Sequence, residues 1–161
     1  MKNEMMNQVN RLVLAVLLRG LRVLYRSDDR VRAEMDSWRK GLTLKLVCGP
    51  GGAALAVRQD DACGVVQMRR AQRTDITMRF KSVSGAFQVL SGQVGISDAY
   101  ARHLFALEGD IYQTMSFVRC VEYIEAYLFP GFMARRILRE VPEKKLSSLR
   151  VYALAAVERM R

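Results

Sequence analysis

The feature that most constrains this chain is a change of hydrophobic period at Gly41. Upstream of it, apolar residues recur at steps of three, one and four, which is the trace of one face of a helix. Downstream, Leu42, Leu44 and Leu46 alternate with polar residues, as in a strand with one buried face. A chain that opens with helices and then turns to consecutive strands is expected to form an α+β fold. The residues of the helical stripe are Val9, Leu12, Val13, Val16, Leu17, Leu21 and Leu24.

We expect the first 40 residues to form a long helix and then a short one. Ser27-Asp28-Asp29 interrupts the stripe and supplies an N-cap for the second helix. The short helix carries Val31, Met35 and Trp38 and ends at Gly41. In the long helix, Leu14 and Leu18 widen the stripe, and four arginines lie mostly off it: Arg11, Arg19, Arg22 and Arg26.

The long helix is both basic and amphipathic. Its apolar run, residues 12–18, is shorter than the ~20 residues needed to span a bilayer. Arginines follow the run, where a signal peptide would have a small-residue cleavage site. We therefore interpret it as a retained helix that packs against the domain or against a second copy of the chain. A helix lying on a membrane surface is the alternative, because a basic flank favours that placement.

Four further segments have the pattern of strands. The clearest is 74–80, which has Ile76, Met78 and Phe80 on one face. The others are 55–57, 64–68 and 104–107. The segments 49–52 and 60–61 are expected to be turns, and such short connections join antiparallel neighbours.

Helices are expected between the last two strands and after them. Ser82 caps a helix that carries Phe87 and Leu90 and stops near Gly92, and Ser97-Asp98 opens another. Asp110 caps a long helix with Gln113 at the capping-box position, and Pro130-Gly131 ends that helix. One face of this long helix carries Thr114, Phe117, Val121, Ile124 and Leu128. A shorter helix with Met133 and Ile137 is expected to run to Pro142. A final helix carries Leu146, Leu149, Ala153, Val157 and Met160.

The net charge is strongly positive. Lys and Arg number 26 against 16 Asp and Glu, a formal charge of +10, which draws a protein toward anionic partners. The excess is spread along the chain, and no run of five or six like charges marks a nucleic-acid tail. The densest basic segment, residues 69–73, could hold a phosphate or lipid headgroup, although a solvated loop is the more frequent reading. Nucleic acid is disfavoured as a partner because the phenylalanines sit on apolar faces and are not interleaved with the basic residues.

Catalytic and metal-binding patterns are weak. His103 is the single histidine and has no acid or nucleophile beside it in sequence. Cys48, Cys63 and Cys120 are an odd number with no CxxC spacing, which argues against a disulfide framework or a zinc site and favours a reducing, cytoplasmic setting. The glycine-rich segment 49–52 lacks the residues of a phosphate loop and reads as a hairpin turn. We expect no enzyme, no cofactor and no metal.

The second half of the chain is rich in soft and aromatic apolar side chains. The chain holds nine Met, a residue that suits adaptable apolar contacts. Ten residues could line one cavity between sheet and helices, and a close-packed core is the alternative reading. They are Met78, Phe80, Phe87, Leu90, Phe105, Met115, Phe117, Val121, Phe132 and Met133.

The order of elements from Asp75 to Asp110 resembles the sterol carrier protein type 2 family (SCP2-like, sterol-binding domain). In that family an Asp opens an alternating strand, a helix ends at Gly, a second small helix begins, and a strand closes with Gly-Asp. The matching segments here are 74–80, 87–92 and 107–110. The preceding three-strand meander also follows the family order, so the resemblance covers residues 28–128.

The resemblance implies a five-stranded, largely antiparallel sheet covered by helices, with an apolar tunnel for sterols, fatty acyl chains or acyl-CoA esters. It implies no catalytic residues, so binding or carriage of lipid is the expected function. The alternative is a peripheral-membrane or protein-interaction module that acts through the basic amphipathic N-terminal helix. We expect one domain over 1–161, with a helical extension at 1–40, the sheet and inserted helices at 41–110, and C-terminal helices at 111–161. The added helices are expected to plug the tunnel, form a homodimer or touch a membrane.

Overall fold

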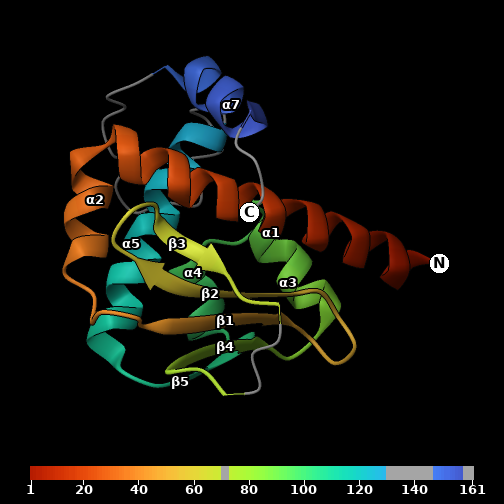
Figure 1. Cartoon of the computed structure of the whole chain (residues 1–161). Coiled ribbons are helices and arrows are strands. Elements are labelled where there is room, and N and C mark those ends of the chain that lie inside the picture. Colours follow the sequence, from red (N-terminus) through yellow and green to blue (C-terminus); the bar gives the residue numbers. More distant parts are fainter. Residues whose placement is uncertain (70–72, 130–146, 158–161) are drawn as a thin grey trace.

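The structure, a computed structural model, describes residues 1–69, 73–129 and 147–157 (Figure 1). Helices and strands follow the order expected from the sequence. In chain order the elements are α1 (Lys2–Ser27), α2 (Asp29–Asp36), β1 (Thr43–Cys48), β2 (Ala54–Asp60), β3 (Gly64–Gln67), β4 (Ile76–Phe80), α3 (Val83–Leu90), α4 (Ile96–Ala101), β5 (Phe105–Glu108), α5 (Ile111–Leu128) and α7 (Ser148–Val157).

The five strands form one sheet in the order β3-β2-β1-β4-β5. The pairs β1–β2, β2–β3 and β4–β5 are antiparallel, and the central pair β1–β4 is parallel. In that parallel pair Leu44 lies opposite Ile76 and Leu46 lies opposite Met78. The largely antiparallel five-stranded sheet predicted from the sequence is therefore confirmed.

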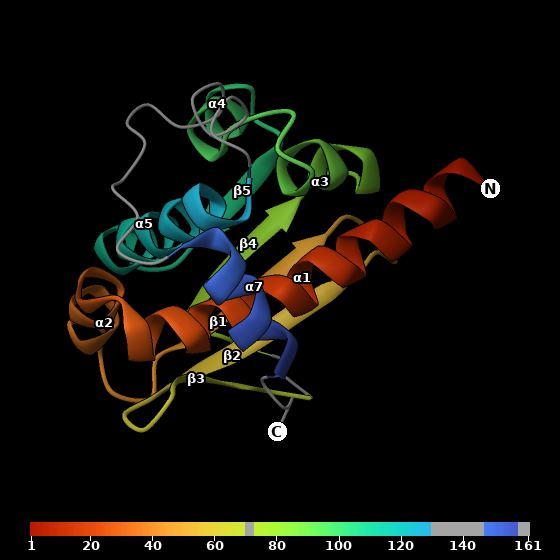
Figure 2. The ribbon, with the colours of Figure 1, turned by 90° about the horizontal axis from the view of Figure 1, so that it is seen from above.

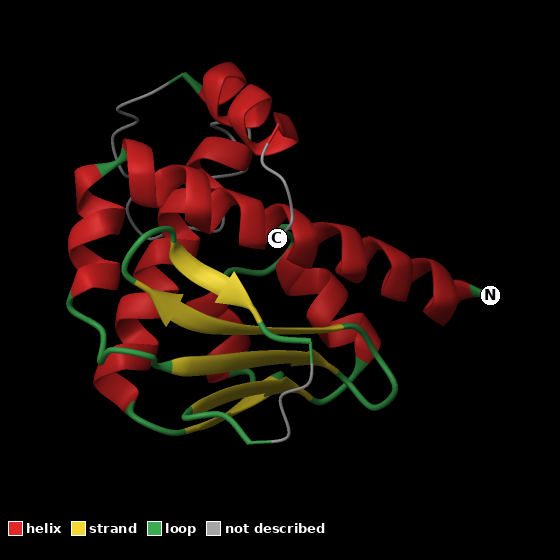
Figure 3. Ribbon diagram, in the orientation of Figure 1, coloured by secondary structure: helices red, strands yellow, loops and turns green. Residues whose placement is uncertain are grey.

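Side-chain alternation gives the sheet one apolar face, which the helices cover. Leu44, Leu46, Ile76, Met78 and Phe80 are all at most 4% exposed. Figure 3 shows the strands at the front, with the helices above and behind them. The core is thus a layer of helices on one side of a single sheet, as the α+β prediction requires.

Helix α1 packs along the domain, which confirms the packing interpretation of its stripe. It contacts α2, α3, α5 and α7. The buried face is centred on Leu14, Leu17, Leu18 and Leu21, whereas Leu12 is 65% exposed. The predicted stripe was therefore turned slightly away from the true one, because a helix wedged between several neighbours buries a wide arc.

Two residues of α1 make contacts that the sequence did not indicate. Arg22, predicted to lie off the stripe, is 3% exposed and donates a hydrogen bond from Nε to the Val65 carbonyl at 3.0 Å. Gly20 lets α5 approach closely, since a Cβ there would lie 3.1 Å from Ile124. Arg22 therefore connects α1 to strand β3, and Gly20 allows α1 to pack closely against α5.

Three of the predicted helix caps are present. The side chains of Asp28, Ser82 and Asp110 accept hydrogen bonds from the backbone at the starts of α2, α3 and α5. The capping box at α5 is incomplete, because Gln113 Oε1 accepts from the Arg39 amide at 3.0 Å. Helix α4 begins earlier than predicted, after Gly95, without a side-chain cap.

The packing face of α7 differs from the prediction. Val151 and Ala155 are buried, whereas Ala153 is exposed and Val157 is 79% exposed. Val151 and Ala155, one turn apart, allow α7 to pack against α1 and α5. The predicted helix with Met133 and Ile137 lies outside the described residues.

Candidate functional site: an apolar pocket between α4, β5 and α5

A half-open pocket of about 250 Å³ lies where α4, β5 and α5 meet. Figure 2 shows these elements on the side of the molecule opposite β3, the other edge of the sheet. Its lining residues are Ile96, Ser97, Tyr100, Phe105, Leu107, Ile111, Met115 and Val118. We call this the α4–α5 pocket.

Local periodicity explains why these side chains converge. Phe105 and Leu107 alternate along β5 and so point to the same face of the sheet. Ile111, Met115 and Val118 are spaced by four and three on α5, which places them on one face of that helix. Gly109 makes the turn that joins β5 to α5, with φ at +116°. The strand and the helix thus form adjoining walls.

Aromatic rings form the floor and the rim of the pocket. Phe105 is 4% exposed and its ring centroid lies 5.3 Å from that of Phe80 beneath it. Tyr100 lies 5.7 Å from Phe105 on the other side and is 54% exposed. Ile111 and Met115 are also partly exposed at the rim. The pocket therefore has a buried aromatic floor and an accessible mouth.

The lining offers little for acid–base chemistry. Among the described lining residues, Ser97 and Tyr100 supply the polar side-chain groups, and none is His, Cys, Asp, Glu, Lys or Arg. Burial of apolar surface is the interaction that such a lining supplies, with the hydroxyls able to meet one polar end of a ligand. The described lining is therefore suited to binding an apolar ligand.

The structure brings two of the ten predicted site residues, Phe105 and Met115, into this pocket. Phe80 supports the floor, and Met78, Phe117 and Val121 are buried in the core. Leu90 packs half-buried against that core. Phe132 and Met133 lie outside the described residues. The ten-residue set stays a prediction.

Phe87 borders a second depression, between the start of α1 and α3. Its volume is about 360 Å³, but five of its seven lining residues are polar or charged: Lys2, Asn3, Ser84, Gln88 and Gln93. A depression of that composition offers an apolar ligand little surface, so we regard the smaller α4–α5 pocket as the candidate site.

Sequence reasoning missed six residues of the α4–α5 pocket: Ile96, Ser97, Tyr100, Leu107, Ile111 and Val118. A signal was present on α5, where Ile111, Met115 and Val118 form a second apolar stripe beside the stripe of Thr114 and Phe117. Two apolar stripes on one helix indicate two apolar contacts, one with the core and one with something else.

One buried carboxyl lies further along α5. Glu125 is 8% exposed, and its Oε2 has no hydrogen-bond partner among the residues that the structure describes. Burial, with a smaller contribution from the charge of Glu122, raises the pKa of Glu125 to about 8. A glutamic acid in this setting is held in its neutral form near neutral pH.

Other candidates from the sequence do not assemble into a site. His103 is exposed, in the left-handed region at φ 55°, just after α4. Within the described ranges there is no group of three or more His, Cys, Asp or Glu that could hold a metal ion. The three cysteines are free. Of the basic segment 69–73, only Arg69 and Arg73 are described, and both are exposed.

A search of the described helices for a membrane span found none with enough length and apolar character.

Comparisons with known proteins bear on the fold. No protein-family model matches the chain, and no curated protein matches its sequence. Among solved structures, similar ones include the following two. Sterol carrier protein 2-like 2 of Aedes aegypti aligns with 17% identity and a TM-score of 0.36, over 60% of this chain and 94% of its own. A conserved hypothetical protein of Thermus thermophilus, suggested to be a sterol carrier protein, aligns with 18% identity and a TM-score of 0.45, over 80% and 91%. The structural similarity to SCP2-like proteins that was predicted from the sequence is thus found, at low identity.

Proposed function

We propose that this protein binds, and carries, an apolar small molecule of the lipid or acyl-chain class in the α4–α5 pocket, without chemical conversion. The observation behind the proposal is the lining itself. Six of its eight residues have purely apolar side chains, and the pocket opens to solvent at Ile111, Met115 and Tyr100. An open apolar pocket with a few polar groups is the usual form of a small-molecule site.

The volume limits what the pocket can hold. Dry apolar cavities of about 150 Å³ already take a benzene ring. A pocket of about 250 Å³ suits a ring system or a short stretch of acyl chain, with the remainder of a longer ligand lying at the mouth. Each methylene buried contributes about 0.8 kcal/mol, and apolar contacts are non-directional. Chains of differing chemistry but similar thickness are therefore expected to bind.

The absence of conversion is part of the proposal. Among the described lining residues, Ser97 has a nucleophilic type of side chain, and none of the others is a base that could activate it. The protein would therefore release a bound ligand chemically unchanged.

The test is a titration with a fluorescent fatty acid. In Met115→Trp the larger side chain fills the mouth, and we expect at least tenfold weaker binding. Tyr112→Trp is the matched control, because Tyr112 is exposed on the same helix and does not line the pocket. Equal binding by both variants, or no binding by the unchanged protein, would contradict the proposal.

A second candidate function is membrane or protein interaction through α1. Met1, Met5 and Leu12 are exposed near Lys2 and Arg11, so the free end of the helix has an apolar strip with basic neighbours. The rest of the stripe is buried in the domain, so removing the whole helix would unfold the protein. Met5→Ser with Leu12→Ser is the better test. Loss of vesicle or partner binding with fatty-acid binding retained would favour this function.

A further inference from the structure

The depression between the start of α1 and α3 suits a different class of ligand from the α4–α5 pocket. Its volume of about 360 Å³ falls within the range of about 300–1,000 Å³ that small-molecule sites occupy. The described linings of the two sites have no residue in common. We call this second site the α1–α3 depression; it is lined by Lys2, Asn3, Met6, Ser84, Phe87, Gln88 and Gln93.

Two asparagines hold α1, one wall of the depression, in place. Asn7 Oδ1 accepts a hydrogen bond from the Ala53 amide at 2.7 Å. The fully buried Asn10 donates from Nδ2 to the Val83 carbonyl at 3.2 Å, and Val83 is the first residue of α3. These two bonds fix the direction of α1 just after its first turn. The lining residues of that turn are therefore held beside α3.

Helical spacing brings the lining side chains together. Asn3 and Met6 are three residues apart on α1, and Ser84, Phe87 and Gln88 are spaced by three and one on α3, so each set lies on one helix face. Met6 is 6% exposed and Phe87 is half-buried, whereas the polar lining residues are exposed. The depression therefore has an apolar base and a polar rim.

Three carboxamides, those of Asn3, Gln88 and Gln93, are the main hydrogen-bonding groups of the rim. Gln93 is held in place, because its Nε2 donates to Ser91 Oγ at 2.9 Å, and its oxygen remains able to accept. The amides of Asn3 and Gln88 have no hydrogen-bond partner in the part of the chain that the structure describes. Each carboxamide has two donor hydrogens and an acceptor oxygen. A ligand would therefore meet donors and acceptors on both walls.

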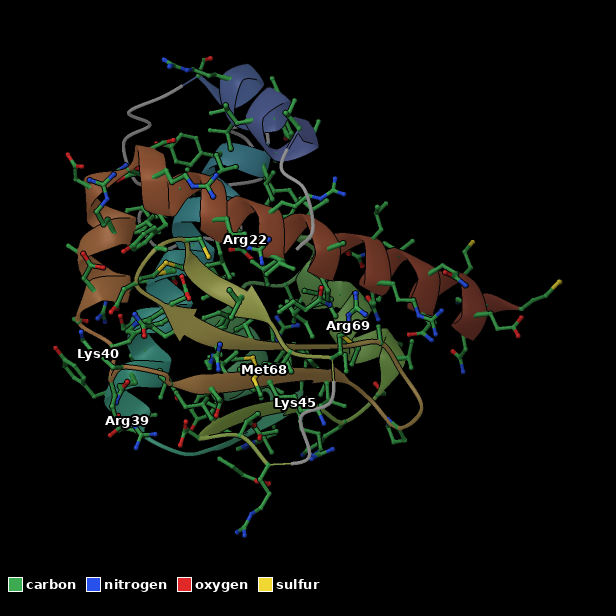
Figure 4. All side chains as sticks on the ribbon, in the orientation of Figure 1. Arg22, Arg39, Lys40, Lys45, Met68 and Arg69 are labelled. Atoms are coloured by element: carbon green, nitrogen blue, oxygen red, sulfur yellow. The ribbon has the colours of Figure 1, made fainter. Side chains whose placement is uncertain are left out.

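The charge of the lining disfavours an anionic ligand. Lys2 is the one charged residue of the described lining. Figure 4 shows Arg39 and Lys40 on the opposite side of the molecule from the start of α1. A phosphate would meet mainly neutral amides here, whereas strong oxyanion sites pair the oxygens with arginine. The lining thus fits a neutral polar ligand better than an anion.

The arrangement of the amides favours a ring with polar groups all around it. A nucleobase presents its hydrogen-bonding groups along the edge of one plane. Here Asn3 approaches from α1, and Gln88 approaches from α3. The hydroxyls of a sugar point outward around the whole ring, and each can both donate and accept. Its C–H groups can be buried against Phe87 and Met6.

We propose that the α1–α3 depression binds a neutral polyhydroxylated ring, that is, a sugar unit. Asn3, Gln88 and Gln93 pair with its hydroxyls, and Phe87 lies against its C–H face. This binding goes beyond ligand binding in the α4–α5 pocket and does not depend on it. A free sugar and the headgroup of a glycolipid offer the same chemistry to the site.

The experiment is a titration of the full chain followed by NMR of the side-chain NH₂ groups, with glucose, galactose and maltose as probes. We expect saturable shifts of the signals of Asn3, Gln88 and Gln93, with that of the buried Asn10 unchanged. No shift of the three signals with any of these sugars would overturn the proposal. Shifts of the same signals by adenosine monophosphate or inorganic phosphate at lower concentrations than by the sugars would also overturn it.

The variant Asn3→Ala/Gln88→Ala removes two of the three amides. A hydrogen bond contributes about fivefold to binding, so this variant is expected to bind the sugar about 25-fold more weakly. The matched control is Gln8→Ala/Gln67→Ala, which removes the same chemical group from two exposed positions outside the depression. It should bind as the unchanged protein does. Equal affinities of the two double variants for the sugar would contradict the proposal.

Two further arms separate the source of the sugar and the two sites. Glucose and octyl glucoside are compared at the NH₂ signals of Asn3 and Gln88: tighter binding of the glucoside supports a glycolipid, and equal binding supports a free sugar. Fatty-acid titration of Asn3→Ala/Gln88→Ala should match that of the unchanged protein. Failure of sugar binding is therefore distinguishable from failure of ligand binding in the α4–α5 pocket.

Discussion

The rings of Tyr100 and Phe105 lie 5.7 Å apart, centroid to centroid, at an interplanar angle of 45°. One ring belongs to α4 and is half in solvent; the other belongs to β5 and is buried against Phe80. Tilted aromatic pairs of this kind contribute about 0.5–1.5 kcal/mol beyond their burial. The pair therefore fixes the short helix α4 against the edge strand and gives the α4–α5 pocket one firm wall.

Affinity for saturated fatty acids should rise with chain length and then level off. Each buried methylene contributes about 0.8 kcal/mol, which corresponds to roughly fourfold tighter binding, until the pocket is full. The measurement is displacement of a fluorescent fatty acid by a series of chain lengths. An affinity independent of length would show that the chain is not buried.

The stability of the protein should fall as pH rises from about 5 to about 8, because of Glu125. Its pKa is 4.5 when unperturbed and is raised to about 8 in the fold, chiefly by burial. The contribution is present below pH 4.5 and is lost as pH approaches the folded value, since the unfolded chain ionises first. The free energy of unfolding near pH 8 is therefore expected to be lower than that below pH 4.5 by on the order of 4 kcal/mol.

Glu125→Gln should remove most of that pH dependence, because glutamine resembles the neutral acid. Urea unfolding at several pH values is the measurement, with Glu108→Gln at an exposed position as control. A Gln variant that loses stability with pH as steeply as the unchanged protein would rule out Glu125 as the cause.

The buried Asp28 joins three elements and should be a stability centre. Its carboxylate caps α2, pairs with the Arg30 guanidinium at 2.8 Å and accepts a hydrogen bond from the Tyr127 hydroxyl at 3.0 Å. Burial alone would raise the pKa of Asp28, but the hydrogen bonds from Arg30 and Tyr127 outweigh it and leave the pKa lowered.

Asp28→Ala is expected to cost about 3 kcal/mol, from the lost helix cap and the lost hydrogen bond with the Tyr127 hydroxyl. Tyr127→Phe should cost about 1 kcal/mol, whereas Tyr112→Phe, at an exposed position, should cost almost nothing. Urea denaturation of the two single variants and the double variant gives the coupling. Additive losses would contradict the contact between Asp28 and Tyr127.

The turn between β5 and α5 should tolerate only glycine. A Cβ on Gly109 would lie 2.2 Å from the Asp75 carbonyl oxygen, and φ is +116°. Gly51 also has a positive φ, +66°, but a Cβ there meets nothing within 4 Å. Gly51→Ala should therefore cost only about 1 kcal/mol of backbone strain, and Gly109→Ala at least about 3 kcal/mol. Similar melting temperatures for the two variants would contradict this account.

Much of the fold could be predicted because local chemistry and tertiary structure agree. The alternation of Ile76, Met78 and Phe80 matches a strand with one buried face, and Asp28, Ser82 and Asp110 cap the helices they precede. The packing faces of α1 and α7 were predicted less well. Both helices have several neighbours, and the sequence does not say which of two adjacent apolar stripes meets them. The division at residues 40 and 110 stays a prediction.

The pocket was harder to predict than the fold. Its walls come from α4, β5 and α5, and the position of α4 depends on the contact of Tyr100 with Phe105. Apolar residues that line a pocket and those that fill a core have the same periodicity, so the buried Met78 and Phe117 could not be told from Met115 at the rim. The distinction is one of three-dimensional packing, which spacing along the chain does not report.

The central claim, that an apolar ligand occupies the α4–α5 pocket, is tested most directly by methyl-resolved NMR during titration with a fatty acid. We predict saturable shifts of the methyl signals of Ile96, Leu107, Ile111, Met115 and Val118, with those of the buried Leu18 and Val31 unchanged. Shifts confined to other parts of the protein, or no shifts at saturating fatty acid, would contradict the claim.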